Sequence, residues 1–211
     1  MRPPRRFCQP LFGTVGLTLL FVAGGLGASV RALVAQAAPP GLVEVKEGGR
    51  RGFWFALGAG AGGESNDVVG SGYSDLFYQP TISLRAGGTV NPHLRLGGEV
   101  LSWFDEQGDA TASLTSALLV AQFYPLGSSG LYLKGGLGIG RNAIDFHDGF
   151  DVGDTGFAGL VGAGLELRLG RKVFLNPVVD LVGHRYNSRT GIDYTERLVN
   201  FGLGVLIQTS R

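Results

Sequence analysis

After Arg51, large apolar residues alternate with small or polar ones along most of the chain. Phe53, Phe55 and Leu57, for example, alternate with Trp54, Ala56 and Gly58. Because successive side chains of a β-strand point to opposite faces, a period of two predicts strands with two different faces. Eight segments show this period or carry enough apolar residues to be strands. They are residues 53–62, 78–86, 94–104, 111–124, 131–139, 161–168, 173–184 and 199–208.

The two faces differ in chemistry. One carries bulky apolar residues, whereas the other carries glycine and the charged residues Arg85, Arg95, Glu99, Lys134, Glu166, Arg168 and Asp180. The interior of a small closed barrel leaves little room, so glycine suits it, and buried charges there need partners of opposite sign. We therefore expect the apolar face to contact lipid and the polar face to fill the lumen. In segment 111–124 the pattern does not show which parity is apolar.

The expected connections alternate in length. Those at 63–77, 142–155 and 185–194 are long and 105–110 is of medium length, whereas 88–92, 125–130 and 170–172 are short. Transmembrane barrels have short periplasmic turns and longer external loops. Aromatic residues near the strand ends predict two interfacial girdles. They are Phe53, Trp54, Phe123, Tyr124 and Phe174 at the short-turn end, and Phe77, Tyr78, Trp103 and Phe104 at the other. The predicted fold is all-β, an eight-stranded antiparallel up-and-down transmembrane β-barrel over residues 52–208.

The first residues have the features of an export signal. Three arginines precede the apolar stretch Leu11–Ala23, and Ala35-Gln36-Ala37 offers a cleavage site. We expect a signal peptide at 1–37 and a periplasmic linker at 38–51, with an uncleaved anchor over 11–30 as the alternative.

Composition narrows the class further. The 211 residues include 37 glycines, only 17% are charged and the mean hydropathy is +0.18, which is unusual for a soluble enzyme. Because 18 basic residues nearly balance 17 acidic ones, no nucleic-acid partner is expected. The single cysteine, Cys8, excludes an intramolecular disulfide and a cysteine-based zinc cluster.

The chain resembles the small outer-membrane barrels of the OmpA/OmpX type. The resemblance lies in the turn Phe123–Gly127, the glycine-rich strand Lys134–Gly140 and the closing strand Val199–Gln208. It implies a monomer in a Gram-negative outer membrane, with both termini in the periplasm. Its partners would be the barrel-assembly machinery, lipopolysaccharide and phospholipid. One departure is that family members commonly end on an aromatic residue, whereas this sequence continues from Gln208 to Arg211.

Two motifs suggest ligands. Gly58–Gly63 satisfies G-x-G-x-x-G, but no helix is predicted after it to hold a dinucleotide, so no cofactor is assigned. Asp145, Asp148, Asp151 and Asp154 recur every third residue around His147. Carboxylates are calcium ligands, so the alternative for this segment is a weak ion site, although the EF-hand spacing is absent. We assign no metal site.

Three other functions compete with a structural role. A lipid A-modifying enzyme would use His184, Ser188 and Glu196 as base, nucleophile and orienting acid. We expect His184 instead to have a structural role, as a lumen histidine bonded to polar neighbours. A soluble lipocalin-like binding barrel would need an apolar lumen, and a channel would need space that seven charged side chains occupy. The expected function is a non-enzymatic outer-membrane barrel with a polar, plugged lumen, no catalytic residue and a structural or surface-contact role.

Overall fold

A computed structural model describes residues 50–68, 72–107, 110–126, 129–146, 151–187 and 193–209. The signal peptide expected at 1–37 and all of the linker before Arg50 lie outside these residues. In the described part no helix is long and apolar enough to cross a membrane. The strands are β1 Phe53–Val68, β2 Phe77–Asn91, β3 Leu94–Gln107, β4 Ala110–Phe123, β5 Leu131–Phe146, β6 Asp151–Leu165, β7 Leu167–Arg168, β8 Val173–Asn187 and β9 Asp193–Gln208.

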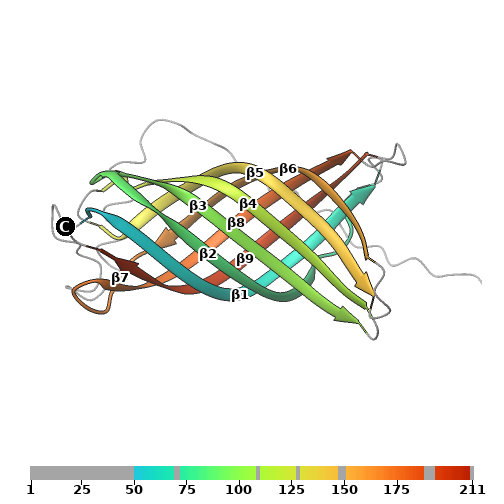
Figure 1. Cartoon of the computed structure of the whole chain (residues 1–211), viewed down its shortest axis with the longest axis horizontal. Coiled ribbons are helices and arrows are strands. Elements are labelled where there is room, and N and C mark those ends of the chain that lie inside the picture. The colour runs from blue at the N-terminus through green and yellow to red at the C-terminus, as the bar shows by residue number, and fades with distance from the viewer. Residues whose placement is uncertain are drawn as a thin grey trace, which may run out of the picture. The chain divides into compact units, whose positions relative to one another are not determined.

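The strands form one closed antiparallel barrel (Figure 1). Apart from β6 and β7, each strand pairs with the next along the chain, and β1 pairs with β9 to close the ring. The short β7 continues β6, because both pair with β8 in one unbroken register. The barrel is therefore eight-stranded, which confirms the predicted fold. We call the end where β1 begins and β9 finishes the terminal end, and the opposite end the distal end.

A proline explains the break between β6 and β7. The register with β8 places Pro177 opposite Leu165, and proline has no N–H to donate to the ladder. The side-chain amide of Asn176 donates to the Leu165 carbonyl instead, at 2.9 Å. The break therefore leaves this carbonyl satisfied.

The faces of the strands lie as the alternation predicts. Leu57 and Leu133 are 61% and 54% exposed on the outer wall, whereas Arg95 and Glu99 are 0% and 2% exposed inside. The structure also settles the parity of β4, in which Leu119 faces outward while Leu118 and its even-numbered neighbours face inward. Both faces of β4 are apolar, which is why its sequence showed no clear parity.

The predicted alternation of long and short connections is wrong. β1 reaches Val68, β5 reaches Phe146 and β8 reaches Asn187, so most of the expected long loops are strand. At the terminal end, residues 124–130 separate β4 from β5, which is longer than the two-residue gap at 108–109 on the distal side. Backbone pairing does not require apolar side chains, so the ladders continue past the apolar part of each strand.

The aromatic girdles are only partly as predicted. Phe53, Phe123, Tyr78 and Phe104 lie exposed on the outer wall, but the other predicted members differ. Trp54, Trp103, Tyr124 and Phe174 are buried inside the barrel, and Phe77 belongs to the inward-facing set at the distal mouth. Position near a strand end does not decide the face, whereas parity does.

Two glycines offer a test of the packing. A methyl group on Gly138 would point into the lumen, 2.8 Å from the Cα of Leu118, whereas one on Gly159 would be 3.9 Å from the nearest atom, on Leu137. We expect Gly138→Ala to lower the free energy of unfolding by about 1–3 kcal/mol through overpacking. Gly159→Ala should leave it unchanged or raise it by up to about 1 kcal/mol. Urea unfolding of the barrel in lipid vesicles measures both, and equal effects would contradict the assigned faces.

Candidate functional site inside the barrel

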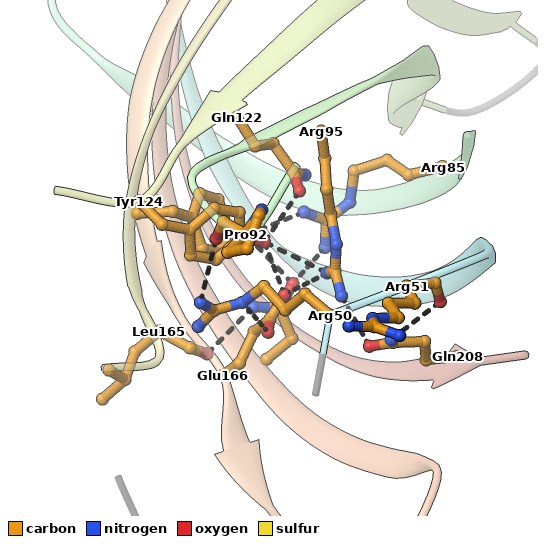
Figure 2. A network of polar contacts seen from close by, with 12 residues as sticks. Arg50, Arg51, Arg85, Pro92, Arg95, Gln122, Tyr124, Leu165, Glu166 and Gln208 are labelled. Atoms are coloured by element: carbon orange, nitrogen blue, oxygen red, sulfur yellow. Dashed lines mark hydrogen bonds and ion pairs between the residues drawn. The ribbon is translucent and has the colours of Figure 1, made fainter. Parts of the chain in front are cut away.

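The lumen at the terminal end holds a buried polar cluster, the terminal network, shown in Figure 2. At its centre the Glu166 carboxylate, fully buried, forms a salt bridge with Arg95. Arg95 also donates to Gln208 Oε1 at 2.7 Å, and the Tyr124 hydroxyl donates to Glu166 Oε1 at 2.6 Å. Residues of three strands and of two segments outside them thus form one network around this carboxylate. The members are Arg50, Arg95, Gln122, Tyr124, Glu166 and Gln208.

Arg50 enters this network from the segment that precedes β1. Its Nε lies 3.4 Å from Glu166 Oε2, its guanidinium stacks 3.8 Å from the centre of the Tyr124 ring, and it donates to the Ser129 carbonyl. The sequence assigned Arg50 to the linker and counted Arg168 as the fourth lumen base. That assignment of Arg168 is wrong, because Arg168 lies exposed at the end of β7, where its Nε donates to the Gly170 carbonyl.

Burial shifts the pKa values of Arg50 and Tyr124, which lie outside the strands. Burial lowers the pKa of Arg50, and the Glu166 carboxylate opposes this by favouring the charged guanidinium. Burial also raises the pKa of Tyr124 well above its usual value, and the negative charge of Glu166 adds to the effect. The Tyr124 hydroxyl therefore keeps its proton and remains a donor to Glu166.

A second cluster, the central network, follows toward the distal end. Lys134 Nζ lies 2.7 Å from Glu99 Oε2 and 3.0 Å from Asp180 Oδ1. Arg85 donates to Tyr132 at 2.9 Å and to Asn176 at 2.6 Å. The central network also includes Thr81, whose hydroxyl donates to Asn200 Oδ1 at 2.7 Å. Buried charges with such partners avoid the several kcal/mol that isolated ions cost.

Beyond the central network, apolar side chains meet across the lumen. We call this cluster the apolar layer, and the sequence did not predict it, because the inner face was assigned mainly to glycine and charge. Its members are Leu101, Trp103, Leu114, Leu118, Val120, Ala158, Leu160, Val182, Tyr186 and Leu198. Leu101, Trp103 and Val182 come from positions that the alternation placed inside, whereas the others lie in the segment of undecided parity or beyond the predicted segments.

Two of the three candidate enzyme residues, His184 and Glu196, lie inside the barrel. His184 and Glu196 are direct partners across β8 and β9, and both are buried in the lumen. His184 Nε2 lies 2.8 Å from Ser116 Oγ on β4, which agrees with the expected lumen histidine bonded to a polar neighbour. Ser188 lies outside the described residues. A serine–histidine pair is present, but Ser116 is 0% exposed and faces the packed interior.

The two ligand motifs have no described site. Gly58–Gly63 lies within β1 and opens no helix. Asp145 is exposed on β5, and Asp154 accepts from the Tyr194 hydroxyl at 3.1 Å. His147 and Asp148 lie outside the described residues, and Asp151 is placed only by its backbone. Within the described part of the chain, no three histidine, cysteine or acidic side chains gather as metal ligands.

Among known proteins, this barrel is similar to solved structures of outer-membrane proteins. The sequence matches no protein-family model and no curated protein. The crystal structure of Neisserial surface protein A, 16% identical, aligns with a TM-score of 0.51 over 74% of this chain and 97% of that one. The chain has the fold of the small outer-membrane β-barrels.

Two further solved structures align at lower similarity. Ail, the attachment invasion locus protein of Yersinia pestis, is 12% identical, with a TM-score of 0.45 over 73% of this chain and 99% of that one. The outer membrane protein OprG from Pseudomonas aeruginosa is 14% identical, with a TM-score of 0.39 over 78% and 100%.

Arg95 and Arg168 provide a matched test of the terminal network. We expect Arg95→Gln to lower the free energy of unfolding by about 3–5 kcal/mol, because it removes the closest partner of a buried carboxylate. Arg168→Gln should change it by less than about 0.5 kcal/mol, since that side chain is exposed. Urea titration in lipid vesicles compares the two variants. A larger loss of stability in Arg168→Gln than in Arg95→Gln would contradict the placement of Arg95 in the lumen.

Proposed function

We propose that this protein is a monomeric, integral outer-membrane β-barrel with a structural and surface-contact role, without catalytic activity and without a conducting pore. The observation that carries the proposal is the inverted distribution of side chains. Large apolar residues cover the outer wall, and ionic residues pair with one another inside. In lipid, a closed barrel is the only sheet that satisfies all its backbone groups.

The outer wall supports a lipid environment. Leu119, Leu137 and Val161 are 79%, 63% and 61% exposed in the middle of their strands. Soluble monomers rarely expose contiguous apolar patches larger than a few hundred Å². A soluble lipocalin-like barrel would require the opposite arrangement, with apolar residues lining the lumen. The wall therefore favours the membrane protein over the soluble alternative.

Arginines on the outer wall support contact with charged lipids. Arg141, Arg185 and Arg197 lie exposed near the distal ends of β5, β8 and β9, on the same outward face as the apolar residues. Guanidinium groups bind phosphate oxygens well, so this rim suits the phosphates of lipopolysaccharide. In this arrangement the distal end faces the exterior and the terminal end faces the periplasm, where the barrel-assembly machinery acts.

The lumen supports a closed, non-catalytic barrel. The terminal network, the central network and the apolar layer succeed one another along it, so side chains fill the space that a pore would need. The histidine of the competing enzyme hypothesis faces this packed interior and not the lipid, where a lipid A-modifying group would have to act.

Fractionation tests the location. Expressed in a Gram-negative host, the protein should sediment with the outer membrane, and its gel mobility in detergent should change on boiling, because a folded barrel resists the detergent. Recovery in the soluble periplasmic fraction would overturn the proposal.

Two substitutions sharpen this test, because Leu137 and Leu169 are almost equally exposed, at 63% and 60%. Leu137 lies in the middle of β5, whereas Leu169 lies at the turn after β7. In lipid, Leu137→Arg should destabilise the barrel by about 2–4 kcal/mol and Leu169→Arg by about 0–1 kcal/mol. In a soluble protein both would be tolerated.

Planar-bilayer recording tests the closed lumen. Leu101, Leu160 and Leu198 belong to one buried cluster inside the barrel, and hydrophobic constrictions exclude water and ions. We expect no stable conductance steps from the inserted protein. As a control for folding, the gel mobility of the protein is measured on the lipid vesicles used for insertion. Reproducible conductance steps from folded protein would contradict the closed lumen.

A further inference from the structure

The outer wall carries two arginines on neighbouring strands near the distal end. Arg185 lies on β8 and Arg197 on β9, and both side chains are exposed. In the ladder between these strands Arg185 pairs with Thr195 and Arg197 pairs with Gly183, so the two arginines are diagonal neighbours. Diagonal positions of an antiparallel pair are about 7–8 Å apart, within reach of long side chains. Both guanidinium groups can therefore contact one ligand between them.

Neither arginine has an acidic partner among the described side chains. The salt bridges found there lie inside the barrel and involve other residues. Asp67 faces Thr195 across the pairing of β1 with β9, but its carboxylate accepts from the Gly72 N–H at 3.0 Å and forms no salt bridge with either arginine. Two positive charges on one part of the outer wall thus lack a counter-charge within the described part of the chain.

Tyr73, which precedes β2, holds Arg197 in place. The Arg197 guanidinium carbon lies 3.5 Å from the centre of the Tyr73 ring, and the Tyr73 hydroxyl hydrogen-bonds with Thr195 Oγ1 at 3.1 Å. The segment that carries Tyr73 is itself tied to β1, because the Ser74 N–H donates to the Asn66 carbonyl at 2.9 Å. A stacked guanidinium directs its N–H groups sideways, away from the ring. Arg197 is therefore ordered by the ring without being neutralised.

Beside the two arginines the apolar cover of the wall is interrupted. Gly183 on β8 pairs with Gly159 on β6, and both face outward. A Cβ on Gly183 would meet no atom within 4 Å, and one on Gly159 would lie 3.9 Å from the nearest atom. Exposed apolar side chains border this pair, with Phe157 on its distal side and Leu181 and Val161 on its terminal side. We call this bare part of the wall the glycine gap.

We propose that Arg185 and Arg197 together bind one phosphate of lipid A, with an acyl chain of the same molecule lying over the glycine gap. This site rests on the proposed function, which places the distal end in the outer leaflet, where lipopolysaccharide lies. Guanidinium groups donate to phosphate oxygens in pairs. A phosphate monoester carries close to two negative charges at neutral pH, which matches two arginines, whereas the phosphodiester of a glycerophospholipid carries one. The lipid contact is thereby assigned to one sector of the rim, over β6, β8 and β9.

Titration of the folded barrel with lipid A tests the site. The mature chain is folded in lauryldimethylamine oxide, a detergent without phosphate, and the amide NMR signals of Gly183 and Gly159 report on the glycine gap. We expect diphosphoryl lipid A to shift both signals saturably. Dephosphorylated lipid A and phosphatidylglycerol lack the phosphate monoester, and glucosamine 1-phosphate lacks the acyl chains. Each of these three should bind roughly fivefold or more weakly than lipid A.

Substitutions at the two arginines and at the gap locate the site. Arg185→Gln and Arg197→Gln should each weaken lipid A binding roughly tenfold or more, because each removes one charged donor from the phosphate. Gly183→Val should weaken it roughly fivefold, because the valine side chain fills the space of the acyl chain. Arg168→Gln is the matched control, since Arg168 is also exposed but lies at the terminal end, and binding should stay within about twofold. Gel mobility with and without boiling checks that each variant folds.

Tyr73 acts as a positioning residue, and a conservative variant separates this role from a general effect on the fold. Tyr73→Leu removes the ring beneath Arg197 and should weaken lipid A binding roughly fivefold. Tyr73→Phe keeps the ring and should stay within about twofold of the unmodified chain. An equal loss of binding in both variants would show that the ring does not hold Arg197 for the phosphate.

Several outcomes would overturn the site. Binding of dephosphorylated lipid A or of phosphatidylglycerol as tightly as lipid A would show that the phosphate monoester is not recognised. An equal loss in Arg168→Gln would show only general attraction between the barrel and an anionic lipid. No saturable binding to the folded chain would reject the site and leave the barrel fold and its location untouched. Failure of the proposed function would appear separately, as absence of the protein from the outer-membrane fraction.

Discussion

The pairing of β1 with β9 is the constraint on which the rest of this structure depends. It closes the sheet, so that no edge strand is left with unpaired backbone N–H and C=O groups. Closure with eight strands leaves an interior just wide enough for side chains. The small residues inside follow from this narrowness. A methyl group on inward-facing Gly204, for instance, would come within 3.2 Å of the Cα of Gly58 on the neighbouring strand.

The narrow interior also explains why the charges form networks rather than isolated pairs. Glu166 lies in the strand break that Pro177 causes. Its carboxylate forms salt bridges with Arg95 on β3 and with Arg50, which lies outside the sheet. Arg50 and Gln208 come from opposite ends of the barrel sequence, and each contacts a member of this network. The network therefore ties the two ends of the closing sheet together, next to the β1–β9 pairing.

Period two in the sequence was sufficient to predict the barrel, its eight strands and the outward face of seven of them. It succeeded at Leu57, Leu133 and Leu203 because lipid and lumen impose opposite chemistry on neighbouring residues. It failed on β4, where Leu118 packs inside and Leu119 outside, since an apolar layer in the lumen makes both faces alike. The positions of the strand ends were also wrong, because the apolar alternation stops before the backbone pairing does.

The site was harder to predict than the fold. Arg85, Arg95, Glu99, Lys134, Glu166 and Asp180 were correctly placed inside from parity alone, but parity does not determine partners. Arg95 and Glu99 were placed on one face, but Arg95 pairs with Glu166, and Arg50 lies before the first strand, where no alternation exists to place it. A basic residue three positions before a barrel strand is the one signal that could have suggested it.

One two-residue step in the sequence gives the distal end its double character. Glu196 and Arg197 are neighbours on β9, so the pleat directs the acid into the lumen and the base onto the outer wall. His184 and Arg185 on β8 divide between the same two sides. The pleat alone thus separates the acids inside the distal end from the arginines outside it, and this separation requires no longer loop.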